Sequence, residues 1–147
     1  METNVGEMVQ RAKELAYRAH AGQVDKAGRP YIEHVARVAA ACADDPEAEA
    51  VAWLHDVGED HPRFYPQIVD TMPAAVVIAA DALDRNIAGD YYARIRTNPL
   101  ALRVKLADIA DNADESRLAL LPADVAARLR MKYAKARKAL AGSGQDG

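Results

Sequence analysis

Residues 51–60 (VAWLHDVGED) join an apolar run to a dense group of ionisable side chains. His55 and Asp56 are adjacent in the chain, and Glu59 and Asp60 follow about one helical turn later. The four apolar residues that precede His55 predict a buried helix that carries these groups into the interior. Imidazoles and carboxylates bind divalent metal ions and transfer protons. This stretch therefore predicts a metal centre or an acid–base site.

Ionisable groups also interrupt two other apolar segments. His34 lies on a helical stripe of apolar residues, and Asp108 lies within residues 104–110 (VKLADIA). Each alone has an ordinary explanation, such as a core His with one hydrogen bond or an Asp paired with an Arg. A buried ionisable group is costly unless it is paired or binds a metal, so we interpret these two residues, with His55 and Asp56, as one metal site. Two imidazoles and two carboxylates suit Mn²⁺, Fe²⁺ or Zn²⁺ better than Ca²⁺.

Glu59 and Asp60 are the candidate proton-transfer groups. They follow His55 and Asp56 by four residues each, so both return to the metal side if the helix continues that far. A carboxylate there would deprotonate a water molecule or protonate a leaving oxygen, and a solvated helix end is the alternative. His20 and His61 lie close to predicted helix ends, and we leave them out of the metal shell.

The elements that must position these groups are helices. Apolar residues recur with helical spacing through almost every segment, and β-branched runs are scarce. We expect an all-α bundle forming a single domain over residues 1–141, followed by a disordered tail, 142–147. The predicted helices cover residues 4–20, 30–42, 46–60, 63–71, 74–83, 91–95, 99–110 and 123–140.

Composition narrows the class of protein. The chain has 147 residues, 50% of them hydrophobic, and a formal net charge of -3, which argues against a general nucleic-acid binder. Its one cysteine, Cys42, lies in an apolar run, and we expect it to be buried. No apolar run approaches the roughly 20 residues that span a membrane, and the N-terminus lacks the features of a signal peptide. These features predict a cytoplasmic protein, and they leave its oligomeric state open.

Four motifs in order carry a resemblance to a known family. They are residues 19–23 (AHAGQ), 26–34 (KAGRPYIEH), 54–60 (LHDVGED) and 104–108 (VKLAD), with Asn112 after the last. The chain thereby resembles the HD superfamily of metal-dependent phosphohydrolases over roughly residues 12–118. Within it, the motifs are similar to the hydrolase domain of RelA/SpoT-type alarmone hydrolases and to their small stand-alone relatives. The resemblance implies an HD-type helical bundle.

The resemblance also implies roles for individual residues. It implies that a single Mn²⁺ is held by His34, His55, Asp56 and Asp108. It implies that Glu59 and Asp60 assist the water that attacks the 3′-pyrophosphate of guanosine tetra- or pentaphosphate. Lys26 and Asn112 would line the nucleotide site.

The likeness is weaker in the segment that recognises the base. Asp25 stands where the family usually carries an Arg that packs on guanine. Gly58, His61 and the segment 91–99 also depart from the usual pattern. Loss of a stacking cation should weaken base recognition more than metal chemistry.

Together these observations predict a metal-dependent hydrolase that acts on a phosphorylated nucleotide as its small-molecule partner. Guanosine 3′,5′-bis(diphosphate) 3′-pyrophosphohydrolase is the specific candidate. The alternatives are an HD-type 5′-nucleotidase that acts on nucleoside monophosphates and a nucleotide-binding regulator without turnover. We expect Lys26 and Lys105 near the phosphates, with Arg29 and Arg94 as further candidates. The Tyr91-Tyr92 pair is a core element or a substrate lid, and we favour core.

Overall fold

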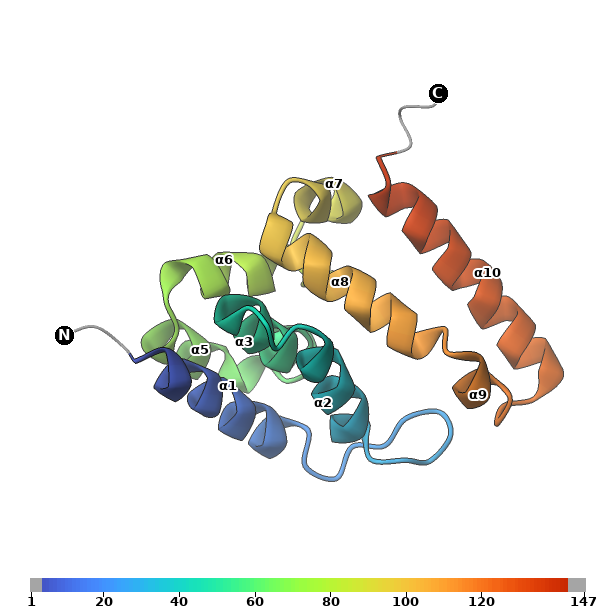
Figure 1. The fold of residues 1–147 in the computed structure, drawn as a ribbon, viewed down its shortest axis with the longest axis horizontal. Coiled ribbons are helices and arrows are strands. Elements are labelled where there is room, and N and C mark those ends of the chain that lie inside the picture. The colour runs from blue at the N-terminus through green and yellow to red at the C-terminus, as the bar shows by residue number, and fades with distance from the viewer. Residues whose placement is uncertain (1–3, 143–147) are drawn as a thin grey trace.

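The structure is a computed structural model that describes residues 4–142, and this part of the chain is helical apart from an isolated β-bridge between Val24 and Pro30. The helices pack around one main hydrophobic core (Figure 1). The expected all-α architecture is thus confirmed. In chain order they are α1 (Val5–Ala19), α2 (Tyr31–Ala41), α3 (Pro46–Leu54), α4 (Val57–Asp60), the 3₁₀ helix η1 (Pro62–Phe64), α5 (Tyr65–Thr71), α6 (Ala74–Ala82), α7 (Tyr91–Arg96), α8 (Pro99–Asn112), α9 (Glu115–Leu118) and α10 (Ala123–Leu140).

Side-chain caps define several helix starts. The Oδ1 atom of Asn4 accepts a hydrogen bond from the backbone N–H of Glu7 at 3.1 Å, and Asn98 caps α8 through Ala101 at 3.0 Å. Pro99 occupies the first position of α8, where a missing N–H costs nothing. Each such cap contributes about 1 kcal/mol to helix stability. These local signals explain why the predicted starts agree with the structure.

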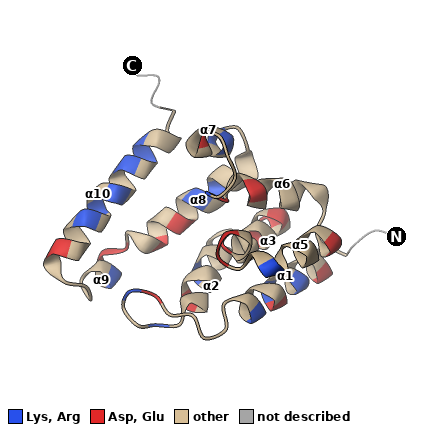
Figure 2. Ribbon diagram, turned by 180° about the vertical axis from the view of Figure 1, so that it is seen from behind, with Lys and Arg blue, Asp and Glu red and all other residues tan. Residues whose placement is uncertain are grey.

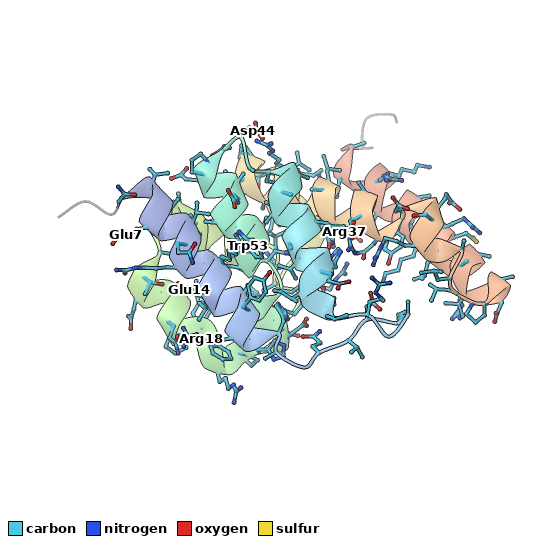
Figure 3. All side chains as sticks on the ribbon, turned by 60° about the horizontal axis from the view of Figure 1, so that its bottom comes forward. Glu7, Glu14, Arg18, Arg37, Asp44 and Trp53 are labelled. Carbon is cyan, nitrogen blue, oxygen red and sulfur yellow. The ribbon has the colours of Figure 1, made fainter. Side chains whose placement is uncertain are left out.

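Helix α3 lies at the centre of the fold. Residues 50–54 are all buried, and α3 packs against α1, α2, α6 and α8. Alanines let the neighbouring helices approach closely, while Val51 and Leu54 fill the interior; burial of each of these larger side chains contributes about 1.5–3 kcal/mol. Trp53 lies next to α1 (Figure 3). Its ring centroid is 5.9 Å from that of Tyr17. This packing holds the end of α3 in place.

The prediction of one continuous helix over residues 46–60 was wrong. Helix α3 ends at Leu54, and α4 starts afresh at Val57. The Nδ1 atom of His55 lies 2.7 Å from the carbonyl oxygen of Ala52, the group that would otherwise accept the N–H of Asp56 in a continuing helix. The imidazole therefore replaces a backbone hydrogen bond, and the His-Asp pair lies in the break.

The C-terminal part forms a smaller second layer. Helix α10 lies on the side of α8 away from α1 (Figure 1), and a separate apolar cluster of Leu118, Ala126 and Leu129 joins it to α9. The sequence did not predict α9. Lys and Arg residues recur along α10 (Figure 2). Of the tail predicted to be disordered, residues 143–147 lie outside the described residues. Among the described helices, none combines the length and apolar character needed to cross a membrane.

Candidate metal centre

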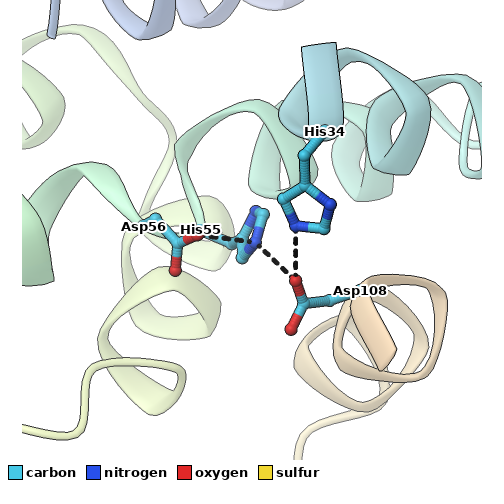
Figure 4. A group of neighbouring side chains, drawn as sticks. All are labelled: His34, His55, Asp56 and Asp108. Atoms are coloured by element: carbon cyan, nitrogen blue, oxygen red, sulfur yellow. Dashed lines mark hydrogen bonds and ion pairs between the residues drawn. The ribbon is translucent and has the colours of Figure 1, made fainter. Parts of the chain in front are cut away.

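The structure brings the four predicted metal ligands together from three parts of the chain. His34 comes from α2, His55 and Asp56 from the break after α3, and Asp108 from α8 (Figure 4). The Oδ1 atom of Asp108 lies 2.8 Å from His34 Nε2 and 3.2 Å from His55 Nε2. His55 Nε2 also lies 3.1 Å from Asp56 Oδ2. One ligand atom from each residue lies within 4.8 Å of all the others.

The hydrogen bonds on the far side of each imidazole determine what these atoms can bind. His34 Nδ1 faces an oxygen of Asp111 at 2.6 Å, and His55 Nδ1 faces the carbonyl of Ala52 at 2.7 Å. Both oxygens are acceptors, so each Nδ1 carries its proton and donates it. In the neutral rings, both Nε2 lone pairs then point at the carboxylate of Asp108. Only a proton or a cation between them makes this arrangement favourable, and the donor set fits a divalent metal ion such as Mn²⁺, Fe²⁺ or Zn²⁺.

Further side chains hold the four ligands in place. Asp111 accepts two hydrogen bonds from Arg37, at 2.7 and 3.1 Å, while its bond with His34 orients that ring. The Tyr31 hydroxyl donates to Asp56 Oδ2. Such outer contacts set ring orientation and ligand basicity in metal sites. The sequence analysis missed all three residues, although Asp111 follows Asp108 by three positions and Tyr31 precedes His34 by three, spacings that place each pair on one helix face.

The carboxylates of the cluster are strongly stabilised in their ionised form. Burial alone would raise the pKa of Asp108, but hydrogen bonds from His34 and His55 hold it well below its usual range. Burial likewise opposes ionisation of Asp56, and the neighbouring His55 lowers its pKa to about 2. The same contacts act in reverse on the imidazoles: against the effect of burial, the carboxylates raise the pKa of His34 and, more strongly, that of His55. The metal-free cluster therefore holds protons where a cation would bind.

The two predicted proton-transfer residues have different surroundings. Glu59 Oε1 accepts a hydrogen bond from the backbone N–H of Arg85 at 2.8 Å, which ties it to the loop before α7. The pKa of Asp60 is raised to about 6, because burial and the charges of Asp56 and Glu59 disfavour its ionised form. A carboxyl group that titrates near neutrality suits proton transfer. The catalytic roles of Glu59 and Asp60 stay predictions.

A cavity of about 630 Å³ adjoins the metal cluster. Tyr31, Asp111 and Asn112 line it and also contact the cluster; Asn112 Nδ2 lies 3.4 Å from Asp108 Oδ1. Cavities of this volume hold small-molecule ligands. Lys26 lines the cavity and has no ion-pair partner among the described residues. The structure thus brings two of the three predicted substrate-binding residues, Lys26 and Asn112, to one cavity beside the cluster.

Lys105, the third predicted substrate-binding residue, lies elsewhere. Its Nζ atom donates to Asp108 Oδ2 at 3.1 Å, so it contacts a candidate metal ligand and is absent from the cavity wall. Arg94 donates to the carbonyl oxygens of Asp84, Ile87 and Ala88, which makes it a loop anchor. The Tyr91-Tyr92 pair packs against the main core, as favoured from the sequence.

Asp25 has a structural role in the loop between α1 and α2. Its Oδ1 atom accepts hydrogen bonds from the backbone N–H groups of Ala27 and Arg29, both at 2.9 Å. Its Oδ2 atom lies 3.5 Å from Arg117. The acid at this position therefore shapes the loop and brings a cation from α9 to the cavity.

The two remaining histidines lie outside the metal cluster, as expected. His20 Nδ1 and His61 Nε2 each lie 2.8 Å from the side-chain oxygen of Gln23. This hydrogen-bonded group packs against the site, because the His20 ring lies 5.1 Å from the ring of Tyr31.

Comparison with known proteins gives partial support for the resemblance. No protein-family model matches the chain. A curated protein to which it is similar is the guanosine-3′,5′-bis(diphosphate) 3′-pyrophosphohydrolase of Haemophilus influenzae, at 38% identity over 74 residues. The match covers 48% of this chain and 11% of the relative, so the chain corresponds to a small part of that protein.

Proposed function

We propose that the protein is a metal-dependent phosphohydrolase of the HD superfamily that acts on a phosphorylated nucleotide. The observation that carries the proposal is the convergence of two imidazole Nε2 atoms and two carboxylates beside an open cavity. The similarity to a pyrophosphohydrolase of guanosine 3′,5′-bis(diphosphate) supports this reaction class and makes the 3′-pyrophosphate of that nucleotide the first candidate substrate.

Each part of the site has a role in such a reaction. A divalent cation, when bound by His34, His55, Asp56 and Asp108, supplies Lewis acidity toward a phosphoryl oxygen and lowers the pKa of water. Asp60 accepts a proton from the attacking water or gives one to the leaving oxygen. Lys26 meets the negative charge of the phosphate, and Asn112 donates to the nucleotide from the edge of the cluster.

One observation favours a second candidate, the 5′-nucleotidase. Most cations of the cavity are already paired: Arg29 lies 3.5 Å from Glu33, and Arg37 binds Asp111. Among the cavity cations in residues 4–142, this leaves Lys26 without an ion pair, and one such cation is a small positive charge for a substrate that carries two diphosphates. A nucleoside monophosphate carries less negative charge and needs fewer cations in the cavity.

A release assay separates the candidates. Chelator-stripped protein is reloaded with Mn²⁺ and offered guanosine tetraphosphate and nucleoside tri-, di- and monophosphates in parallel. Pyrophosphate from guanosine tetraphosphate supports the alarmone reaction, and orthophosphate from monophosphates supports the nucleotidase. Metal binding without any turnover supports the regulator.

Two variants complete this assay. Asp56→Ala should lose metal and activity together, because it removes a ligand from the cluster. Asp70→Ala removes an exposed carboxylate on α5 and is the matched control, which should keep both. Full turnover by the Asp56→Ala protein would contradict the metal assignment.

A further inference from the structure

Arg117, which follows Ser116 in α9, has an unusual position in the cavity wall. Its guanidinium lies 3.5 Å from Asp25 Oδ2 and 3.8 Å from Asp111 Oδ2, so opposite charge holds it in place. Its Nε atom is buried and makes no hydrogen bond within the described part of the chain. The side chain is 27% exposed. The guanidinium is therefore fixed in the cavity wall, and a ligand can reach the exposed part of the side chain but not the buried Nε atom.

The other cations of the cavity differ from Arg117. Arg37 uses two donors on Asp111, and Arg29 lies at the rim with 62% of its side chain exposed. Lys26 makes no ion pair within the described part of the chain and suits a phosphate. Arg117 already has two carboxylates close by, and these would repel a phosphate oxygen at the same guanidinium. Its donors are better matched to acceptor atoms on an uncharged group.

The surface next to Arg117 is apolar. Leu118, Leu121, Leu129 and Tyr133, from α9, α10 and the turn between them, line the same cavity. A flat apolar face can cover an aromatic ring, while a planar guanidinium binds two acceptors on the ring edge. The O6 and N7 atoms of a 6-oxopurine form such an edge, whereas a 6-aminopurine presents a donor at position 6.

We propose that Arg117 is a specificity-determining residue, which binds the O6/N7 edge of the substrate's base and selects 6-oxopurines over 6-aminopurines. The proposal rests on the proposed function for the position of the reacting phosphate, at the metal cluster. It adds a binding site for the base, at the end of the substrate opposite the reacting phosphate, between Arg117 and the apolar wall of α9 and α10.

Nucleoside binding tests the proposal without phosphate, metal or turnover. Inosine and adenosine share their ribose and differ at the edge in question. Calorimetric titration of chelator-stripped protein should give an inosine affinity at least about tenfold above that for adenosine, the lower end of discrimination by a bidentate Arg contact. Equal affinities, or no saturable binding of inosine, would overturn the proposal.

Two variants identify the residue responsible. Arg117→Lys keeps the charge beside Asp25 and Asp111 but loses the planar fork, so the preference for inosine should disappear while circular dichroism stays unchanged. Arg130→Lys makes the same exchange at an Arg that is paired with Glu115 outside the cavity, and it should keep the preference. A preference that persists in Arg117→Lys would refute the role of Arg117. If that variant fails to fold, the comparison of inosine with adenosine on the parent protein still decides the base preference.

The two proposals fail separately. An inosine preference without hydrolysis of any nucleotide would contradict the phosphohydrolase and leave the base site standing. Hydrolysis without discrimination between the two purines would contradict the role of Arg117 alone.

Discussion

Replacing Asp111 by Asn tests whether the outer contacts set up the metal centre. In the structure, Asp111 accepts from His34 Nδ1 at 2.6 Å and thereby leaves the Nε2 lone pair for a metal. An Asn oxygen can still accept this bond, but it lacks the charge that increases the basicity of the ring. Outer-contact substitutions of this kind reduce metal affinity about 10- to 100-fold, equivalent to roughly 1.4–2.7 kcal/mol.

The positive charges that Asp111→Asn leaves unpaired should reduce the metal affinity further. Arg37 and Arg117 would lose their carboxylate partner at this position, and their positive charge would then oppose a cation. Calorimetric titration of chelator-stripped protein with Mn²⁺ measures the loss. Glu33→Gln is the matched control, because it removes a carboxylate from the same helix as His34 without touching the cluster. If Asp111→Asn loses no more affinity than Glu33→Gln, the orientation of His34 by Asp111 is refuted.

The metal-free protein should also lose stability in the Asp111→Asn variant. Burial opposes ionisation of Asp111, but hydrogen bonds from His34 and Arg37 lower its pKa from 3.8 to about 2. A shift of this size corresponds to about 2.5 kcal/mol. Because the folded-state pKa is lowered, this stabilisation is present above about pH 4 and disappears as the pH falls through about 2. Urea unfolding at pH 7 and at pH 2 should show the difference between the variants shrinking with acidity.

Three other predictions concern protons. Binding of Mn²⁺ near pH 6–7 should release about one to two protons, because the raised pKa values of His34 and His55 keep Nε2 protonated until a metal displaces the proton. Calorimetry in two buffers of different ionisation enthalpy measures the number of protons released. A release of zero protons contradicts the prediction. Asp60→Asn should stabilise the metal-free protein at pH 7.5, because the pKa of Asp60 is raised from 3.8 to about 6 and the charged form is disfavoured in the folded state. The shift corresponds to about 3 kcal/mol, reduced to about 1 kcal/mol by exposure to solvent. The gain should vanish below about pH 3, where the folded and unfolded forms both bind the proton. A gain that persists there would point to a different cause. Asp60→Asn should slow turnover about 100-fold with Mn²⁺ still bound. Glu59→Gln keeps an acceptor for the N–H of Arg85, and its turnover shows whether Glu59 shares the role in proton transfer. Unchanged turnover in both variants would assign proton transfer to another group.

The sequence was sufficient to bring the four candidate ligands together, because His34 and Asp108 are ionisable groups on the apolar faces of their helices. It was insufficient where a side chain competes with the backbone: the helix break at His55 depends on an imidazole that takes the carbonyl of Ala52. Asp111 and Arg37 were missed for another reason. In the sequence they look like ordinary surface charge, and only the packing of α2 against α8 brings them to the candidate metal centre.

Helix α10 contributes Leu129 and Tyr133 to the apolar part of the cavity wall beside Arg117. Its first half, however, is joined to the molecule through a small cluster separate from the main core. Such a segment opens locally at a lower free energy than the whole protein unfolds. Opening of α10 would dismantle one side of the cavity, so a ligand there binds the closed form and shifts this equilibrium. Amide hydrogen exchange in the first half of α10 should therefore slow when the cavity is filled, while exchange in α3 changes little. The C-terminal helix would then report occupancy of the cavity even in the absence of catalysis.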